Sequence, residues 1–187
     1  MVRWKGGHVH QAYLTGVLGE FFEFVPVCPE VEVGMGVPRP TIRLELHDDR
    51  TRLIDPKHGI DWTAAMTKLA RTRTGMVDES DLSGFILKKD SPTCGPWRVK
   101  RYESGHSTRQ GVGMFAAALL ERYPLLPIED EGRLNDPALR ENFIERVFAF
   151  RRLERLFSPR WTYGDVVAFH TREKLLVRSH DDRRYRD

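Results

Sequence analysis

The chain has 187 residues, of which 40% are hydrophobic and 30% charged, and its formal net charge is +3 at pH 7. These are ordinary values for a globular protein, and the length is sufficient to bury a full core. No apolar run approaches the roughly 20 residues needed to cross a bilayer, and the N-terminal residues form no signal-peptide core. The composition therefore argues against a membrane-spanning or secreted protein, and we expect a cytoplasmic one.

The positive charge lies at the C-terminal end of the chain. From residue 150 onward there are ten Lys or Arg against six Asp or Glu, which leaves the preceding part close to neutral. A basic segment of this size can contact nucleic acid, but it is more often the solvated face of a helix. We therefore rank nucleic acid below a small molecule as the partner.

Apolar residues and helix breakers divide the first half of the chain into short elements. The predicted elements, in chain order, are a helix at 11–22, strands at 24–27, 41–46 and 51–54, a helix that begins after Asp61, and a strand at 84–87. Cys28-Pro29-Glu30 ends the first strand, and the loop 88–96 follows the last one. The segment 31–40 contains two Gly and two Pro, which is typical of a loop.

The second half contains longer helices. We predict a helix at 111–123, a strand at 125–128, a helix from Asp136-Pro137 to about residue 157 and a further helix that begins near Gly164. Asp136-Pro137 is typical of a helix start, because the carboxylate caps the helix and proline fits its first turn. Alternating strands and helices predict an α/β fold, with a mostly parallel, Rossmann-like sheet flanked by helices and followed by C-terminal helices. We expect an α/β domain over 1–130 and a helical segment over 131–187.

The only two cysteines, Cys28 and Cys94, each lie in a loop that follows a predicted strand. Each has a proline and a polar residue within three positions, in Cys28-Pro29-Glu30 and in Ser91-Pro92-Thr93-Cys94-Gly95. Ligands of open α/β sheets bind beyond the carboxyl ends of strands, so these two thiols could meet there. Thiolates prefer soft metals and iron–sulfur clusters. The pair predicts one metal–sulfur site.

Two other interpretations of the cysteines stay open on the residues alone. Free cysteines are often buried and inert, and they then act only as small apolar side chains. A zinc site of two cysteines and two histidines would need His8 and His10, which point the same way in an extended segment. Two cysteines are too few for a disulfide scaffold, and a reducing cytoplasm keeps them as thiols.

Several motifs resemble the 2-thiouracil desulfurase family. They are Gly6-Gly7-His8, the segments at 21–31 and 34–40, Ser91-Pro92-Thr93-Cys94-Gly95, and Gly111-Val112-Gly113-Met114-Phe115. This resemblance covers residues 2–130. The segments 133–136 and 168–172 further resemble members that append a helical domain.

The resemblance implies a [4Fe-4S] cluster held by three cysteines, with one open iron that binds the sulfur of the substrate in a hydrolysis without net redox change. Cys28 and Cys94 match two of these ligands. Glu30 and Ser91 match the catalytic polar residues beside the cluster, which would move protons. The family's first cysteine lies just before the stretch matched by Val2-Arg3. The resemblance therefore implies a chain that lacks the first strand and the first cysteine, stops early in the second domain, and holds its cluster poorly.

The leading hypothesis is an iron–sulfur desulfurase whose small-molecule partner is a thiolated pyrimidine-type heterocycle. The alternative is a non-enzymatic module that binds a nucleic acid or another partner through its basic C-terminal helices. In that case Cys28 and Cys94 would only pack.

Overall fold

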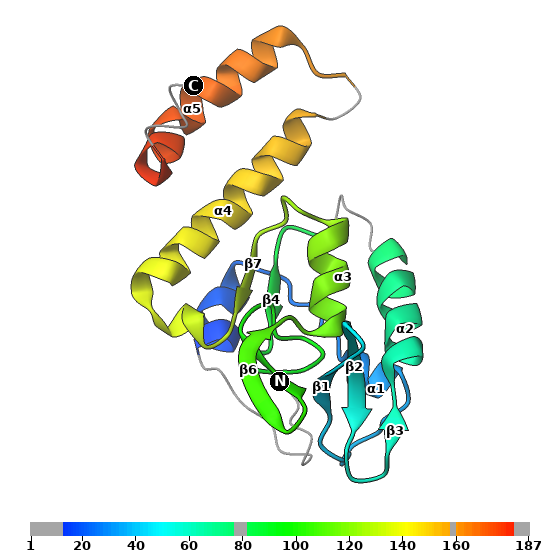
Figure 1. Cartoon of the computed structure of the whole chain (residues 1–187). Coiled ribbons are helices and arrows are strands. Elements are labelled where there is room, and N and C mark those ends of the chain that lie inside the picture. The colour runs from blue at the N-terminus through cyan, green and yellow to red at the C-terminus, as the bar shows by residue number, and fades with distance from the viewer. Residues whose placement is uncertain (1–12, 77–81, 158–159, 182–187) are drawn as a thin grey trace.

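The computed structural model describes residues 13–76, 82–157 and 160–181. An α/β body carries helices α2 and α3 side by side, and the long helix α4 leads away from this body to α5 (Figure 1). Among the described residues, no helix combines the length and the apolar character that a membrane crossing requires. His8 and His10, the histidines of the zinc interpretation, lie outside the described residues.

A five-stranded sheet forms one part of the body, in the order β3-β2-β1-β5-β6. Its strands are β1 (Arg43–His47), β2 (Arg50–Asp55), β3 (Ile60–Asp61), β5 (Val99–Glu103) and β6 (His106–Gly111). Two-residue turns close the β1–β2 and β5–β6 hairpins. Asp48 and Asp49 have φ of 49° and 59°, and Ser104 and Gly105 have φ of 46° and 83°. Two consecutive positive φ values suit the twist of a tight antiparallel hairpin.

A separate pair of parallel strands, β4 (Phe85–Leu87) and β7 (Ile128–Asp130), lies beside helix α3 (Met114–Arg122). Apolar side chains of these elements form one buried cluster, which includes Leu87, Ala116, Leu119 and Ile128. A second cluster joins the five-stranded sheet to helix α2 (Thr63–Met76) through Leu44, Leu53, Met66 and Val99. The Tyr123 hydroxyl donates to the Thr74 carbonyl and so ties the end of α3 to α2.

The predicted α/β class with C-terminal helices is confirmed, but the sheet is not mostly parallel. Among the described strand pairs, only β1–β5 and β4–β7 are parallel, and the three other pairs are antiparallel. The reason is the hairpins: strands joined by two residues must run in opposite directions, whereas a parallel pair needs a long crossover.

The structure also differs from three of the predicted elements, those at 11–22, 24–27 and 125–128. The segment 24–27 forms no strand, and the side chain of Val25 is 77% exposed. In the described part of the helix expected at 11–22, a π-helical turn, η1 (Tyr13–Val17), precedes a 3-10 turn, η2 (Leu18–Glu20). The strand expected at 125–128 begins only at Ile128, because Leu125 is exposed and Leu126 packs in the core.

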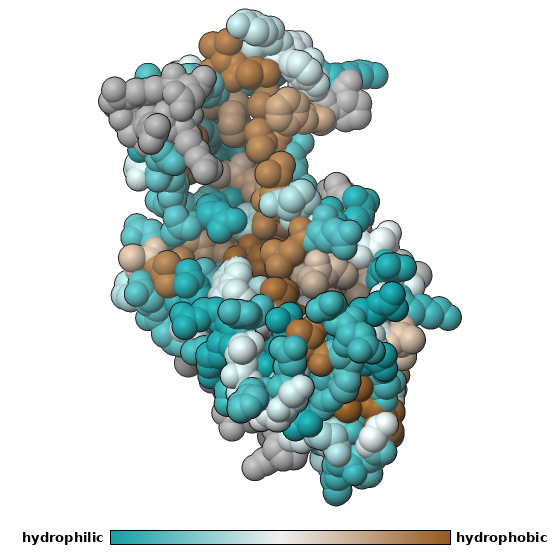
Figure 2. Space-filling model, in the orientation of Figure 1, coloured by the Kyte–Doolittle hydropathy of each residue, from teal (hydrophilic) through white to brown (hydrophobic). Residues whose placement is uncertain are grey.

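The C-terminal helices are confirmed. A 3-10 turn, η4 (Arg133–Asn135), leads into α4 (Pro137–Leu156), whose first amides at Ala138 and Leu139 donate to the Asp136 carboxylate at 2.9 and 3.2 Å. A capping box of Thr162 and Asp165 begins α5 (Tyr163–His180). Arg152 of α4 binds the buried Glu173 of α5 through two hydrogen bonds. Hydrophobic side chains gather along these C-terminal helices (Figure 2).

Candidate functional site

Cys28 lies at the start of a helix. It is the N-cap of α1 (Pro29–Glu32), and its carbonyl accepts hydrogen bonds from Val31 N at 3.1 Å and Glu32 N at 3.0 Å. Pro29 suits the first helical position, because its fixed φ is helical and it has no amide to satisfy. The Cys28-Pro29-Glu30 motif is therefore the N-terminus of a helix, and one short turn carries both the thiol and the Glu30 carboxylate.

Cys94 lies in the loop that follows β4, and this loop is organised around Ser91. The Ser91 Oγ accepts hydrogen bonds from Thr93 N at 3.2 Å and Cys94 N at 3.0 Å, while its carbonyl accepts from Gly95 N at 2.8 Å. Such a hydroxyl-to-amide turn fixes the backbone locally. The Ser91 side chain therefore sets the position of the Cys94 sulfur.

The same loop is docked on the N-terminus of α3. The Thr93 carbonyl accepts from Phe115 N at 2.9 Å and from Ala116 N at 3.2 Å, two amides of the first helical turn that otherwise have no partner. Gly113 permits this approach: a Cβ atom there would lie 2.5 Å from the Thr93 carbonyl carbon and oxygen. The helix predicted from Gly111 therefore begins only at Met114: Gly111 ends β6, and Gly113 is the N-cap of α3, where a residue without a Cβ atom is needed for packing against the cysteine loop.

One hydrogen bond joins the two cysteine segments. The Ser91 hydroxyl donates to Glu30 Oε1 at 3.2 Å. The four residues expected at the site, Cys28, Glu30, Ser91 and Cys94, are therefore brought together by α1 and by the loop after β4. The Ser91 oxygen accepts two amide protons and donates one proton, so its hydrogen-bonding capacity is fully used.

Arg39 is a fifth member of this site, and the sequence analysis did not single it out. Its buried guanidinium donates from Nε to Glu30 Oε2 at 2.7 Å, and Nη2 contacts the same oxygen. Nη2 also lies 4.0 Å from Cys28 Sγ, and Nη1 donates to the Gly36 carbonyl at 3.2 Å. A buried arginine needs such partners. Its place in the family-like segment 34–40 was the one sequence signal that could have pointed to it.

The surroundings of Cys94 shift the pKa of its thiol. Burial raises the pKa of Cys94 well above its usual range, and the nearby Glu30 carboxylate and Cys28 raise it further. The hydrogen bond with Ser91 and the charge of Arg39 oppose this rise in pKa. Without a cation beside it, the Cys94 sulfur is therefore a thiol at neutral pH, whereas a bound metal cation would favour the thiolate.

A cleft of about 290 Å³ opens beside these residues. Its lining includes Glu30, Arg39, Ile42, Lys88 and Ser91. This volume is at the small end of the usual range for ligand pockets, so the cleft suits a single small heterocycle.

The residues of the site fit an iron–sulfur cluster in kind but not in number. Cys28 and Cys94 are thiol donors of the type that such clusters require, and the hydrogen bonds above hold their segments together. They are the only cysteines of the sequence. The described residues contain no group of three or more His, Cys, Asp or Glu that could hold a metal ion. The donor set described here therefore does not complete a three-cysteine cluster site.

Comparison with known proteins decides the family. The family described as 2-thiouracil desulfurase matches residues 1–131. This chain belongs to the 2-thiouracil desulfurase family. A solved structure of the [4Fe-4S]-dependent thiouracil desulfidase TudS matches with a TM-score of 0.53 and 28% sequence identity, over 75% of this chain and 89% of that one. The curated proteins contain no match.

Membership in the desulfurase family confirms the resemblance and the enzyme class expected from the sequence. The roles of Cys28, Glu30, Ser91 and Cys94 stay predictions. Their arrangement adds one physical point: the Glu30 carboxylate and the Ser91 hydroxyl line a small cleft and are hydrogen-bonded to each other. The two cysteines lie in the same two segments, but neither of them lines the cleft.

We predict opposite effects for alanine at two glycines. Gly113→Ala should lower the free energy of unfolding by about 1–3 kcal/mol, because its Cβ atom would overlap the Thr93 backbone. Gly75→Ala, in helix α2 with nothing within 4 Å of its Cβ position, should raise it by about 0.5–1 kcal/mol through helix propensity. Urea denaturation of both variants measures this. A stable Gly113→Ala variant would show that the loop is not packed on α3.

Proposed function

We propose that this chain is an iron–sulfur-dependent desulfurase that removes sulfur from thiolated pyrimidine-type heterocycles such as 2-thiouracil. The reaction is a hydrolysis: water supplies the oxygen that replaces the sulfur, and sulfide leaves with no net change in redox state. The single observation that carries this proposal is the Ser91–Glu30 hydrogen bond. It supports the proposal because a carboxylate and a hydroxyl, groups able to transfer protons, are hydrogen-bonded between the segments of the two cysteines.

Cys28 and Cys94 supply two thiolate ligands for the cluster in this proposal, and the third ligand must come from a group other than a cysteine of this sequence, such as a thiol added during reconstitution. A bound cluster would supply a soft Lewis acid that accepts the substrate's sulfur atom. The resemblance of the two cysteine motifs to the family supports this role, and the Cys28 sulfur lies 4.0 Å from the Arg39 guanidinium.

Glu30 acts as the general base and acid in this proposal. Arg39 holds one of its carboxylate oxygens, and Ser91 donates to the other. The carboxylate is therefore fixed in direction before the substrate binds, which is the condition for efficient proton transfer. Ser91 can pass a proton between Glu30 and the substrate ring when one of its two amide donors, Thr93 N or Cys94 N, gives up its lone pair on the hydroxyl oxygen.

Glu30 and Glu32 form a matched pair for testing this role. Both lie in α1, but Glu32 pairs with Arg73 at the surface, at 2.5 and 3.0 Å. Glu30→Gln should lower kcat for sulfide release from 2-thiouracil by about 10²–10⁴-fold, because the amide cannot accept a proton. Glu32→Gln should stay within about twofold of the wild type. Anaerobic assays of both products, sulfide and uracil, on reconstituted protein measure this.

Equal activity of the two glutamine variants would contradict the role of Glu30. Absence of sulfide release from the reconstituted wild type would contradict the proposed function itself. Far-UV circular dichroism of both variants serves as the control for folding.

A second role rests on a cleft of about 360 Å³ between α4 and α5. Its lining includes Arg155, Arg160, Trp161, Phe169 and Arg172. Within the described residues, Arg155 and Arg160 form no ion pair, and the Trp161 side chain is half exposed. Guanidinium groups beside aromatic rings suit a nucleic acid. We propose nucleic-acid contact here as an accessory to the desulfurase, and the non-enzymatic form of this hypothesis loses its support because the family is one of enzymes.

The accessory role predicts a salt-dependent affinity. Replacing both Arg155 and Arg160 by Gln should weaken binding of a labelled single-stranded oligonucleotide and reduce the slope of log affinity against log salt by about 1–2. Lys68→Gln, on the distant helix α2, is the control and should change neither quantity. Fluorescence anisotropy across a salt series measures this, and an unchanged slope in the double variant would contradict the role.

A further inference from the structure

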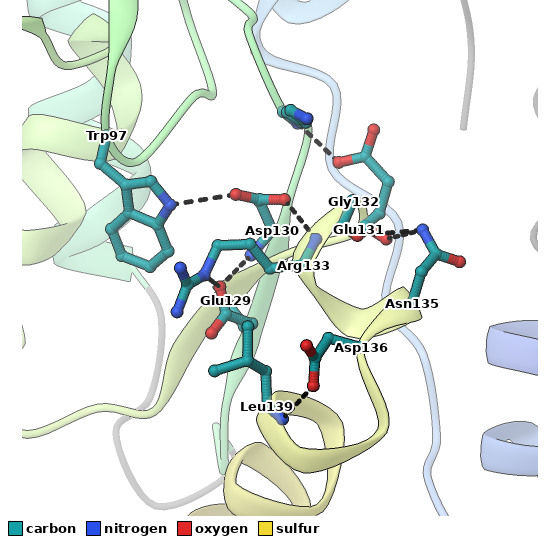
Figure 3. Close-up of polar contacts among 10 residues, drawn as sticks. Trp97, Glu129, Asp130, Glu131, Gly132, Arg133, Asn135, Asp136 and Leu139 are labelled. Atoms are coloured by element: carbon teal, nitrogen blue, oxygen red, sulfur yellow. Dashed lines mark hydrogen bonds and ion pairs between the residues drawn. The ribbon is translucent and has the colours of Figure 1, made fainter.

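Strand β7 and the residue after it carry three consecutive buried carboxylates. Glu129, Asp130 and Glu131 are only 6%, 2% and 5% exposed. Carboxylates that are removed from water cost several kcal/mol each unless hydrogen bonds and charges compensate. Each of the three has such partners, and Figure 3 shows that they point to different parts of the structure.

Glu131 holds the first residues of the cysteine loop. Its Oε1 forms an ion pair with Lys88 Nζ, and its Oε2 accepts from the Lys89 amide at 2.5 Å. Its own amide donates to the Leu87 carbonyl at 3.1 Å. Both carboxylate oxygens of Glu131 are thus used at the point where the chain leaves β4, two or three residues before Ser91.

Asp130 holds the other end of the same loop. Its Oδ2 accepts from Trp97 Nε1 at 3.0 Å, and its Oδ1 accepts from Arg133 N at 2.8 Å. Trp97 follows Cys94 by three residues. The two adjacent carboxylates therefore bind both ends of the segment 88–97, in which Ser91 and Cys94 lie.

Glu129 differs from its two neighbours. Its Oε1 accepts from Asp130 N at 3.0 Å and from Arg133 Nε at 2.8 Å, and both donors lie in β7 or in the turn that follows it. Glu129 therefore has nearly the same burial and charge as Glu131 but no direct hydrogen bond to the cysteine loop. It reaches the loop through Arg133, whose guanidinium lies 5.4 Å from the centre of the Trp97 ring.

We propose that Asp130 and Glu131 are positioning residues of the desulfurase site. They fix the two ends of the 88–97 loop, so that the Ser91 hydroxyl meets Glu30 and the Cys94 sulfur faces the site. The catalytic part of this inference rests on the proposed function. The structural part, that the two carboxylates hold the loop, does not depend on it. Gly132 gives independent support, because a Cβ atom there would lie 2.6 Å from Lys89 Cδ, so the loop start packs directly on this turn.

Glu131→Gln and Glu129→Gln test the proposal as a matched pair. A glutamine at 131 has one acceptor oxygen for two donors, so one of the two loop contacts must be lost. A glutamine at 129 can keep its single oxygen on both donors. Hydrogen exchange of the full chain, followed by mass spectrometry, should show amides of 88–95 exchanging about tenfold faster in Glu131→Gln. Glu129→Gln should leave them unchanged, and both variants should leave the β1–β2 hairpin unchanged.

The kinetic readout separates positioning from general loss of stability. Glu131→Gln should lower kcat for 2-thiouracil by about tenfold with an unchanged KM, because the loop misplaces Ser91 without removing it. Trp97→Phe, which removes only the indole donor to Asp130, is a second and milder variant in case Glu131→Gln does not fold.

Equal exchange of the 88–95 amides in Glu131→Gln and Glu129→Gln would overturn the positioning role, as would wild-type exchange in Trp97→Phe. A wild type that releases no sulfide would contradict the proposed function instead. The exchange data would still decide whether Glu131 holds the loop.

Discussion

The hydrogen bond from Ser91 to Glu30 is the contact on which the rest of the site depends. It joins two segments that are 61 residues apart in the sequence, the short helix α1 and the loop after β4. Each segment carries one cysteine with a proline and a polar residue close to it. Because the same hydroxyl also accepts the Cys94 amide, one side chain connects the Glu30 carboxylate to the backbone of the second cysteine. Catalysis by proton transfer requires this kind of fixed geometry.

The surrounding fold can be understood as support for that contact. Arg39 orients Glu30 from one side, and the N-terminus of α3 holds the Thr93 carbonyl from the other. The parallel pair β4–β7 places the carboxylates of Asp130 and Glu131 next to the ends of the cysteine loop. Several buried charges therefore serve one loop, at a cost in desolvation that would be hard to explain for a loop without a function.

The sequence predicted which segments come together better than it predicted the sheet, and the roles of the four residues stay predictions. Two short sequence motifs contain Cys28, Glu30, Ser91 and Cys94. Such motifs can be recognised even where the helices and strands around them are predicted wrongly. Cys28 in fact begins a helix instead of ending a strand. The β5–β6 hairpin was not predicted, because its segments VKRYE and HSTRQG are polar and mostly exposed, so they carry no apolar alternation. The roles of Arg39 and Glu131 depend on partners distant in sequence, which no local pattern contains. The C-terminal helices were predicted well, since Asp136-Pro137 is a strong cap that needs no tertiary contact.

Iron binding by the two cysteines tests the central claim most directly. Wild type, Cys28→Ser and Cys94→Ser would be reconstituted anaerobically side by side, with iron per chain and visible absorbance measured for each. One shared site that holds two of the three cysteines predicts that the wild type takes up iron with thiolate-to-iron charge-transfer absorption, but less iron per chain than a complete [4Fe-4S] cluster contains. It also predicts that either serine variant loses both signals, because a hydroxyl is a poor ligand for soft iron sites. Equal iron in all three proteins, or no iron in the wild type, would contradict the account.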